Sequence, residues 1–428
     1  MRVLIITKEV WRDDQNGGNT LTWMFSRFPE DIEIAQVYCS EGKPDNNVCR
    51  NYYKLSTRDI VRAIRYNKGQ DAGTPFILNL TEADNTANVK NRKRYLSTIT
   101  NSEVLRDFIW KTGVFKSKKL KDYILSFDPD IIYAPGYGVN YMNYLIHWIC
   151  SFVNCPVVSL ISDDYYSFHQ RRINPLFWIG LIRLRHNVRK SVNCYDLIYT
   201  MTDVQKKQLE KDFSVPVKIM RKGYSFNDEM IENRKISDPI RIIHVGNIYY
   251  NRWKTLSTLG KCIKDINVDK EKYKLEIVTS YGMSDEIRSS LENNGIIIHN
   301  NVSSEELRDL YKSCDIAVHV EGFDFINRLK MRMSFSTKII EYLASGCAIV
   351  MICDKRQSTY RYMEEHKLAV LIDDEKKIKD TLARLYSNKE EILSIRNKAF
   401  AYGKANHSVE MVSKKMWEDF TDLIMQKA

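Results

Sequence analysis

The 428-residue sequence lacks the features of several large classes of protein. It has no apolar run of about 18 residues, the length that a membrane-spanning helix requires. Its nine cysteines include no Cys-x-x-Cys pair, which argues against a zinc site or a disulfide framework. Several of them, such as Cys194, Cys347 and Cys353, lie in or beside apolar runs, so we expect buried free thiols in a reducing compartment. Residues 1–9 read as a buried strand rather than a signal peptide, which predicts a cytoplasmic protein.

The short motifs that mark common nucleotide sites are also missing. The chain contains neither a G-x-G-x-x-G sequence nor a P-loop Gly-Lys-Ser/Thr. No Asp-x-Asp stands at the end of a predicted strand, where it could hold a divalent ion, so we expect no metal and no other cofactor. The net charge of +11 favours an anionic partner, which could be a nucleotide, a phospholipid surface or nucleic acid.

What the sequence does contain is an alternation of short apolar runs and helical stretches. A hydrophobic content of 44% and a charged content of 28% are typical of folded proteins, and the length suits two α/β domains. The alternation predicts parallel sheets covered by helices. The predicted strands cover residues 3–7, 32–38, 131–134, 156–161, 197–200 and 215–219 in the first half, and 240–245, 275–279, 296–299, 316–320 and 348–352 in the second.

A polar segment divides these two series of strands. We expect a first domain over residues 1–222, a linker over 223–238 and a second domain over 239–408. Ser303 and Glu306 form a capping box, which predicts a helix over 303–313. Residues 409–425 carry apolar side chains at helical spacing and could pack on either domain. Residues 67–98 lack periodicity and read as a long loop or insertion.

The most informative motif runs from Ser334 to Gly346. Ser336 is a good helix N-cap, and Thr337, Lys338 and Glu341 would place a hydroxyl, a cation and a carboxylate near the same helix start. A helix start and a cation can bind a diphosphate, and a carboxylate can accept hydrogen bonds from a ribose. The motif therefore predicts a nucleotide-diphosphate site, although a surface helix with an ordinary cap remains an alternative.

Two strand ends in the second half carry further candidates. The strand 240–245 runs into Gly246-Asn247 and is followed by Arg252 and Lys254, two cations that could neutralise a diphosphate or could simply be solvated. The strand 316–320 ends in His319-Val-Glu321, whose side chains share one face. Either side chain could touch a sugar or phosphate, or could have a capping or packing role.

Two strand ends in the first half are weaker candidates. Gly17 and Gly18 stand before the apolar-periodic run 21–28, where they could let backbone approach a ligand or form a plain turn. Asp163 and Asp164 follow the strand 156–161. They could orient or deprotonate an attacking hydroxyl, or cap the next helix.

Two basic, aromatic segments suggest a surface for an anionic membrane. The segment from Arg171 to Lys190 combines apolar residues with Arg and Lys and has no acid, and residues 104–125 have a similar composition. Amphipathic helices that pack on a sheet would explain both segments equally well.

Taken together, these residues resemble a GT-B glycosyltransferase, most similar to the retaining family 4 type that builds bacterial surface polysaccharides. The best-matched segments are Val245-Gly246-Asn247 with Arg252, residues 313–321, and residues 336–346. The resemblance implies two doubly wound Rossmann-like domains facing each other across a cleft. It also implies that the final helix returns to the acceptor-binding first domain, which becomes 1–222 plus 409–428, while the second domain holds the sugar nucleotide.

The resemblance assigns roles to individual residues. It implies that Glu341 binds the nucleotide ribose, that Arg252 takes the place of the diphosphate-binding Lys of the family, and that Lys338 adds positive charge nearby. Gly17 and Gly18 match the glycine loop that faces the donor phosphates and acceptor.

The sequence also departs from the family pattern. Ser162 replaces the His of the His-Asp pair near Asp163. Met333 stands eight positions before Glu341, where the family has a second glutamate, and Glu321 could fill that catalytic role from an elongated loop over 324–332. Asn247 stands where the family commonly has Arg, which shifts the diphosphate charge to Arg252 and Lys254.

The resulting hypothesis is a retaining, metal-independent hexosyltransferase that moves a sugar from a UDP-linked donor to a glycan or lipid-linked acceptor in surface polysaccharide synthesis. The donor-binding residues would be Gly17, Gly18, Asn247, Arg252, Lys254, His319, Ser336, Thr337, Lys338 and Glu341, with Glu321 and Asp163 as catalytic candidates. The enzyme would be cytoplasmic, and contact with the inner face of the plasma membrane stays open. A nucleotide-sugar epimerase of the same fold and a non-catalytic membrane- or nucleic-acid-binding protein are the alternatives, although no nucleic-acid motif is present.

Overall fold

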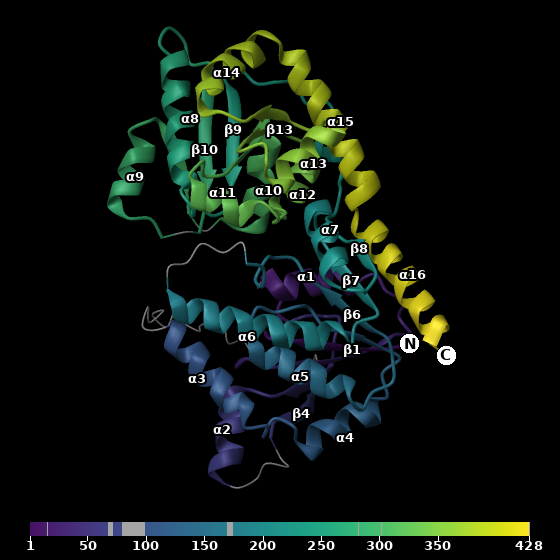
Figure 1. Cartoon of the computed structure of the whole chain (residues 1–428). Helices are drawn as coiled ribbons and strands as arrows, with labels where there is room; N and C mark the ends of the chain where they lie inside the picture. The colour runs from purple at the N-terminus through teal and green to yellow at the C-terminus, as the bar shows by residue number, and fades with distance from the viewer. Residues whose placement is uncertain are drawn as a thin grey trace. The chain divides into compact units, whose positions relative to one another are not determined.

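The computed structural model of the chain describes residues 1–14, 16–66, 72–78, 99–168, 174–280, 282–300 and 302–427. These residues form two compact units. Unit 1 comprises Met1–Thr200, Lys206–Met220 and Ser413–Ala428, and unit 2 comprises Met201–Gln205 and Arg221–Val412. Each unit is an α/β domain built on one mainly parallel sheet, which confirms the fold class expected from the sequence (Figure 1).

Unit 1 holds an eight-stranded sheet in the order β4-β3-β2-β1-β5-β6-β7-β8. Neighbouring strands are parallel, except that β3 and β4 are antiparallel. The strands are β1 (Arg2–Thr7), β2 (Glu33–Tyr38), β3 (Asn51–Lys54), β4 (Thr74–Ile77), β5 (Ile131–Tyr133), β6 (Val157–Leu160), β7 (Leu197–Thr200) and β8 (Val217–Ile219). The helices are α1 (Asn16–Phe25), α2 (Thr57–Arg65), α3 (Ile99–Lys111), α4 (Lys118–Phe127), α5 (Asn140–Cys150) and α6 (Pro175–Val192), with parts of α7 (Asp203–Asp212) and α16 (Val409–Lys427).

Unit 2 holds a six-stranded parallel sheet in the order β11-β10-β9-β12-β13-β14. The strands are β9 (Ile240–Val245), β10 (Tyr273–Val278), β11 (Ile296–His299), β12 (Ile316–Val320), β13 (Ala348–Ile352) and β14 (Val370–Ile372). The helices are α8 (Arg252–Ile266), α9 (Asp285–Glu292), α10 (Ser304–Ser313), α11 (Phe325–Met331), α12 (Lys338–Ala344), α13 (Ser358–His366), α14 (Ile378–Ser387) and α15 (Lys389–His407).

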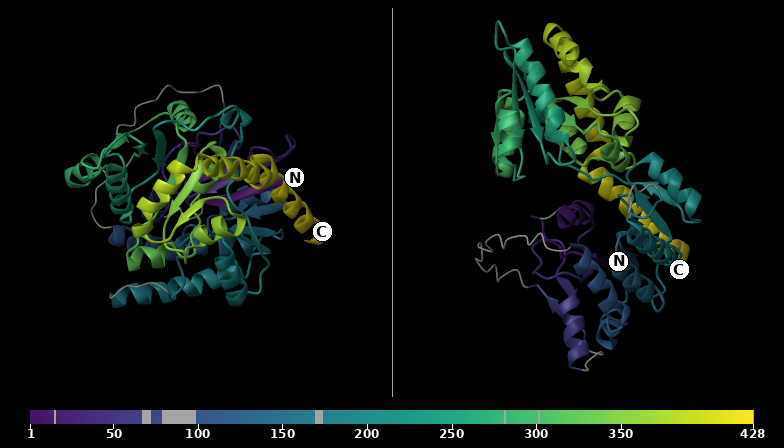
Figure 2. Two further views of the ribbon diagram at one scale, coloured as in Figure 1. Left: turned by 90° about the horizontal axis from the view of Figure 1, so that it is seen from above. Right: turned by 60° about the vertical axis from the view of Figure 1, so that its left-hand side comes forward.

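The two faces of the second sheet bury different sets of side chains. Ile243 and Ala317 join the core under α10, α12, α13 and α15, whereas Ile242 and Ile316 join the core under α8, α9 and α14. Successive residues of a strand point to opposite faces, so this alternation is what a sheet covered on both sides requires. Helices lie on both faces of the sheet (Figure 2).

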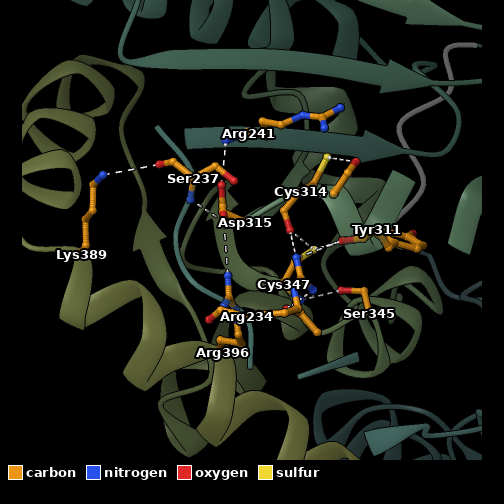
Figure 3. Close-up of polar contacts among 12 residues, drawn as sticks. Arg234, Ser237, Arg241, Tyr311, Cys314, Asp315, Ser345, Cys347, Lys389 and Arg396 are labelled. Carbon is orange, nitrogen blue, oxygen red and sulfur yellow. Dashed lines mark hydrogen bonds and ion pairs between the residues drawn. The ribbon is translucent and has the colours of Figure 1, made fainter. Parts of the chain in front are cut away.

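The segment 223–238, expected as a linker, lies within unit 2. Arg234 anchors it, because its guanidinium donates to the carbonyl oxygens of Gly346 at 2.7 Å and Tyr311 at 3.2 Å, and also to that of Cys314 (Figure 3). Asp315 accepts hydrogen bonds from the backbone N–H groups of Ser237 and Arg241, at 3.3 and 3.0 Å. The bonds from Arg234 thus tie the segment to carbonyl groups at the end of α10 and after α12, and those to Asp315 tie it to the start of β12.

The carboxyl-terminal part of α16 packs within unit 1. Trp417 and Phe420 meet the ring of Phe28, with centroids 5.5 and 6.0 Å away, and Tyr199 donates to Asp419 at 2.7 Å. The apolar spacing predicted over 409–425 is therefore the buried face of an observed helix. Among the helices in the described ranges, none combines the length and the apolar character needed to cross a bilayer.

Each predicted strand is present, with ends shifted by at most two residues, and the capping box of Ser303 and Glu306 starts α10 as expected. The sequence does not predict β3, β4 and β14, which are short strands at or next to a sheet edge. The prediction of a long loop over 67–98 is therefore wrong in part, because β4 lies within that segment. The rest of the segment, apart from residues 72–78, is outside the described residues. The prediction of an elongated loop over 324–332 is also wrong, because this segment contains α11. The helix is capped by Asp324, whose side chain accepts a hydrogen bond from the Asn327 N–H.

Candidate functional site

The sheet of unit 2 has its topological switch point between β9 and β12. The chain proceeds outward from β9 to β10 and β11 on one side, and from β12 to β13 and β14 on the other. The loops that leave the carboxyl ends of β9 and β12 therefore diverge to opposite faces, and open α/β sheets bind ligands at such a point. These two loops, 246–251 and 321–324, contain or adjoin several of the residues selected from the sequence.

An Arg–Glu pair joins the two loops. Arg252, the first residue of α8, donates from Nε to Glu321 Oε2 at 2.9 Å and from Nη2 to Glu321 Oε1 at 2.6 Å. Both side chains are nearly buried, with exposed fractions of 13% and 4%. Arg252 Nη1 also donates to Asn247 Oδ1 at 2.5 Å. These three bonds leave further N–H donors on the guanidinium, which carries more than three.

The carboxylate of Glu321 is held in its ionised form. Burial alone would raise the pKa of Glu321, but the neighbouring His319 and the charge of Arg252 outweigh burial, so the pKa lies below its ordinary value. His319 Nε2 lies 3.3 Å from Glu321 Oε1, an ion-pair distance at which it makes no well-aligned hydrogen bond. The expected positions of Glu321 and His319 at one strand end are thus observed, and both side chains are buried, Glu321 against the arginine and His319 against Glu321.

A second histidine, not selected from the sequence, lies one strand away. His244 on β9 is buried, and its Nδ1 lies 3.0 Å from the Val318 carbonyl oxygen. Burial lowers the pKa of His244 to about 4, so the ring is neutral at pH 7. Its Nε2 has no hydrogen-bond partner among the described residues. Only the strand pairing reveals it, because in sequence it is one polar residue inside an apolar run.

Helix α12 presents Lys338 and Glu341 beside the same loops. Lys338 Nζ donates to Glu341 Oε2 at 2.7 Å, and the hydroxyl of Tyr311 donates to Glu341 Oε1 at 2.7 Å. A Cβ placed on Gly246, whose φ is +145°, would lie 4.0 Å from Lys338 Cγ. The loop after β9 and the start of α12 therefore lie next to each other, so both pairs of charges adjoin that loop.

Tyr342 fixes α12 against the strand ends. The backbone N–H of Val245 donates to the Tyr342 hydroxyl at 2.9 Å, and that hydroxyl lies 3.2 Å from the carbonyl oxygen of Val245 and 3.3 Å from that of Val318. The tyrosine is buried. Because a buried hydroxyl needs a partner, these contacts set the register of the helix on the sheet.

The cap predicted for this helix differs from the one observed. The helix begins at Lys338, Thr337 is its cap residue, and no side chain makes a cap hydrogen bond. Ser336 instead uses its backbone: its carbonyl oxygen accepts from the Ile339 N–H at 3.0 Å, and its N–H donates to Thr359 Oγ1 at 3.3 Å. The prediction that the Ser336 side chain caps the helix is therefore wrong, because the turn before the helix uses the backbone of Ser336. Both hydroxyl residues still stand at the helix start.

Lys254 is placed differently from Arg252. It is exposed, and its ammonium lies 5.6 Å from the ring centroid of the preceding Trp253. It lies in the first turn of α8, two residues beyond Arg252, and no ion pair joins it to the Arg252–Glu321 pair.

Two residues missed by sequence reasoning act on Glu341. Tyr311 lies thirty positions earlier on α10, and only the packing of α10 against α12 brings its hydroxyl to the carboxylate. Burial lowers the pKa of Lys222, while the charge of Glu341 opposes that shift and the charge of Lys338 adds to it. Lys222 is therefore close enough to both residues to feel their charges. No local motif marks either position.

In unit 1 the two glycines have different surroundings. Both belong to the first turn of α1 rather than to a loop. A Cβ on Gly18 would lie 2.1 Å from the Arg12 carbonyl oxygen, so the absence of a side chain admits the neighbouring backbone. A Cβ on Gly17 would meet nothing within 4 Å. Of the two glycines, Gly17 is the one that presents bare backbone to open space.

The two aspartates after β6 also differ. Asp164 accepts from the backbone N–H of Ser167 at 3.1 Å and from its hydroxyl at 2.6 Å, so it closes the local turn. Asp163 is exposed, and Ser162 Oγ lies 3.5 Å from its carboxylate. The geometry thus leaves Asp163 as the more accessible carboxylate of the pair.

Comparison with known proteins gives a family match in unit 2. Residues 239–388 match the family model described as Glycosyl transferases group 1. No curated protein sequence gives a significant match. The match covers β9 to α14, which includes Arg252, Glu321 and Glu341.

Solved structures with this fold span the whole chain. A sucrose-phosphate synthase from Thermosynechococcus elongatus has a TM-score of 0.61 at 11% identity, with 100% of each chain covered. An E. coli structure described as trehalose-6-phosphate bound with UDP-2-fluoro glucose has a TM-score of 0.60 at 12% identity, covering 98% of this chain and 99% of the other. TarM has a TM-score of 0.61 at 11% identity, with 98% of each chain covered. This structural similarity shows the GT-B fold. The family match over residues 239–388 supports a sugar-transferring glycosyltransferase.

Proposed function

We propose that this chain is a retaining glycosyltransferase that moves a hexose from a UDP-linked donor to a glycan or lipid-linked acceptor in surface polysaccharide synthesis. In this proposal unit 2 binds the donor and unit 1 binds the acceptor. The observation that carries it is that Arg252 and the Lys338–Glu341 pair both adjoin the loop after β9, at the switch point of a sheet that matches a glycosyltransferase family.

The donor diphosphate would be bound by Arg252 and Lys338. Glu321 orients the guanidinium by a two-point contact, so the remaining N–H donors are fixed in direction before a ligand arrives. Lys338 uses one donor on Glu341, which leaves its other ammonium donors for a phosphate. Positive charge fixed in this way stabilises a departing nucleoside diphosphate, which is the main chemical demand of the reaction.

The ribose would be bound by Glu341. Each of its oxygens accepts one hydrogen bond, from Tyr311 and from Lys338, and a carboxylate oxygen can accept more than one. The side chain is only 14% exposed, so a ribose hydroxyl would meet a carboxylate whose direction is already set. Ser336, Thr337 and Asn247 would lie near the diphosphate as neutral donors.

The two catalytic candidates would act differently. Both oxygens of Glu321 are engaged by Arg252, so we assign it to positioning that arginine rather than to touching the sugar. In a retaining reaction the leaving phosphate itself can take the acceptor proton, and then no side-chain base is needed. Asp163 would be the base only if the reaction inverts the anomeric centre.

Helix α6 supports contact with an anionic membrane. Leu176, Ile179 and Ile182 are 74%, 65% and 59% exposed at intervals of one helical turn, and Arg183 and Lys190 are exposed nearby. Apolar side chains rimmed by cations suit an anionic lipid surface. Co-sedimentation with anionic vesicles should fall in a Leu176→Ser/Ile179→Ser variant and at high salt, and should not fall in the matched exposed variant Val268→Ser. Equal sedimentation of all three proteins would contradict membrane contact.

The proposed function is tested by a donor screen. Thermal unfolding is measured with a panel of nucleoside diphosphates and nucleotide sugars, because a ligand that binds only the folded chain raises the midpoint. The proposal expects UDP and UDP-sugars to give the largest shifts. Product analysis without acceptor then separates the alternatives, since an epimerase converts the sugar while it stays attached to the nucleotide. Epimer formation at full turnover, or no shift with any nucleotide, would contradict the proposal.

A further inference from the structure

A cavity of about 300 Å³ in unit 2 is lined by an unusual number of arginines. Four arginines lie around it, Arg328, Arg332, Arg356 and Arg361, and among the described residues Asp354 is the only acid in its lining. The cavity lies beside the candidate donor site but shares none of the residues assigned to it.

Asp354 only partly neutralises the charge of the two arginines that it contacts, Arg356 and Arg328. Asp354 is engaged by Arg356, from Nε at 2.8 Å and Nη2 at 2.7 Å, and by Arg328 Nη1 at 3.1 Å. The hydrogen bond from Arg356, aided by Arg328, lowers the pKa of Asp354 well below its usual range despite the opposing effect of burial. One carboxylate therefore faces two guanidinium groups, so positive charge remains after this pairing.

Two further features indicate room for an anion. Arg328 Nε is buried and has no hydrogen-bond partner among the described residues, which is a cost that an acceptor would remove. Arg361 is exposed at the cavity, and no carboxylate of the described residues lies within ion-pair distance of its guanidinium. Guanidinium groups bind phosphate oxygens at two points, which suits a phosphate or diphosphate.

The rest of the lining is apolar. Phe325, Leu329 and Val204 contribute side chains to it, and Phe325 is 48% exposed. A free inorganic anion would leave these side chains in contact with water. A phosphate that carries an apolar chain would cover them, and the burial of that apolar surface adds to the affinity.

The cavity lies at the same sheet edge as the candidate donor site. Asp354 follows β13 by two residues, and β13 pairs with β12, with Val320 opposite Ile352. The backbone N–H of Glu321 donates to the Ile352 carbonyl oxygen at 3.1 Å. The arginine cavity and the Arg252–Glu321 pair are therefore reached from neighbouring strand ends.

We propose that this cavity binds a phosphate or diphosphate group esterified to an apolar chain. The arginines take the phosphate oxygens, and the apolar chain lies against Phe325 and Leu329. That the ligand is the lipid phosphate attached to the acceptor's sugar rests on the proposed function, in which unit 1 binds that sugar; that the cavity binds an amphiphilic phosphate rests on its own lining. The acceptor would then be lipid-linked rather than a free glycan.

The test is calorimetry of the full chain with octyl phosphate below its micelle concentration. We expect Arg361→Gln and Arg356→Gln to weaken binding by about tenfold, the scale of one charge-assisted hydrogen bond. Lys355→Gln is the matched control, because this lysine carries the same charge next to Arg356 but does not line the cavity. It should change the affinity less than about twofold. Equal affinity of the wild type and both arginine variants would overturn the proposal.

Two further ligands separate the possible sources of the phosphate. Inorganic phosphate and glucose 6-phosphate should bind more weakly than octyl phosphate, because neither covers the apolar wall. If glucose 6-phosphate binds as tightly, the cavity recognises a sugar phosphate and the apolar part of the proposal is wrong. UDP binding should be unchanged in Arg361→Gln, so a failure of this inference leaves the donor site and the proposed function standing.

Discussion

Arg252 donates two parallel hydrogen bonds to Glu321, from Nε to Oε2 at 2.9 Å and from Nη2 to Oε1 at 2.6 Å. The two residues lie 69 positions apart and follow the two strands that flank the switch point of the second sheet. The pair therefore couples the loop after β9 to the loop after β12. It also directs the other edge of the guanidinium, which donates to Asn247 and keeps further N–H groups, away from the Glu321 carboxylate, as a phosphate site needs.

The first prediction concerns Arg252→Lys. Lysine keeps the charge but cannot make the two-point contact, so one oxygen of the buried Glu321 loses its partner. We expect the variant to lose about 1–3 kcal/mol of unfolding free energy and about tenfold in affinity for UDP. Denaturant titration and calorimetry measure the two effects.

Arg288→Lys is the matched control for that experiment. Arg288 makes an exposed pair with Glu292 on α9, at 3.1 Å, and such pairs contribute little. Its substitution should leave both quantities nearly unchanged. If Arg252→Lys behaves like Arg288→Lys, the pair does not position a phosphate-binding group.

The second prediction concerns Tyr311→Phe. The change removes the hydroxyl that donates to Glu341 Oε1 at 2.7 Å and leaves the ring in place. We expect the donor KM to rise about threefold to tenfold with kcat little changed, because the carboxylate stays present but is less well oriented. Tyr386→Phe, which removes a hydroxyl bonded to the exposed Asp238 at 3.2 Å, should leave the KM unaltered. The same KM in both variants would remove the positioning role of Tyr311.

The third prediction concerns the pH dependence of stability. Burial lowers the pKa of His244 to about 4, below the value of about 6.5 in an unfolded chain. The unfolded chain therefore binds the proton first, so this contribution to stability is complete above about pH 6.5 and falls as the pH drops towards 4. Between pH 7 and 5 the loss should be about 2 kcal/mol for this residue.

His244→Gln isolates that contribution. His407 is also buried, with a pKa lowered to about 3, so the variant should keep the part of the dependence that His407 supplies. We expect the difference in unfolding free energy between pH 7 and 5 to shrink by about 2 kcal/mol in the variant. If the unfolding free energies of wild type and variant change equally between pH 7 and 5, the fold does not hold His244 neutral.

The fourth prediction uses the two adjacent glycines. Gly18→Ala would place a Cβ 2.1 Å from a backbone carbonyl oxygen that cannot move aside cheaply, so thermal unfolding should occur at a lower temperature. Gly17→Ala meets nothing within 4 Å and should leave the midpoint unchanged or raise it, because alanine favours the helix. If Gly17→Ala nevertheless lowers turnover, Gly17 contacts a substrate. Equal midpoints for the two variants would contradict the assigned packing of Gly18.

The sequence predicts the fold well because its signals are local. Each central strand is an apolar run that is buried on both faces, and Ser303 with Glu306 marks the start of α10 within four residues. The edge strands are harder to predict, because β3, β4 and β14 are short and depend on a neighbouring strand for their hydrogen bonds. Helix α11 depends on one Asp cap at the start of seven residues, too short a segment for a periodic pattern.

The candidate site is predictable in its charges but not in its pairings. The sequence selects Arg252, Glu321 and Glu341, yet it pairs neither the arginine with the first glutamate nor Tyr311 with the second. Those partners come from separate strands and helices, and only the order of strands in the sheet brings them together. Ser336 illustrates the reverse case, because a good capping residue is bypassed when the preceding turn already uses its backbone.

The most direct test of the central claim is the release of nucleoside diphosphate from a panel of nucleotide sugars, measured for the wild type and for Glu341→Ala. We expect the wild type to release UDP from at least one UDP-sugar, with or without acceptor, and Glu341→Ala to require much more donor or to lose turnover while unfolding at a similar temperature. No release from any donor, or equal kinetics in the two proteins, would contradict the assignment of unit 2 as a sugar-nucleotide site.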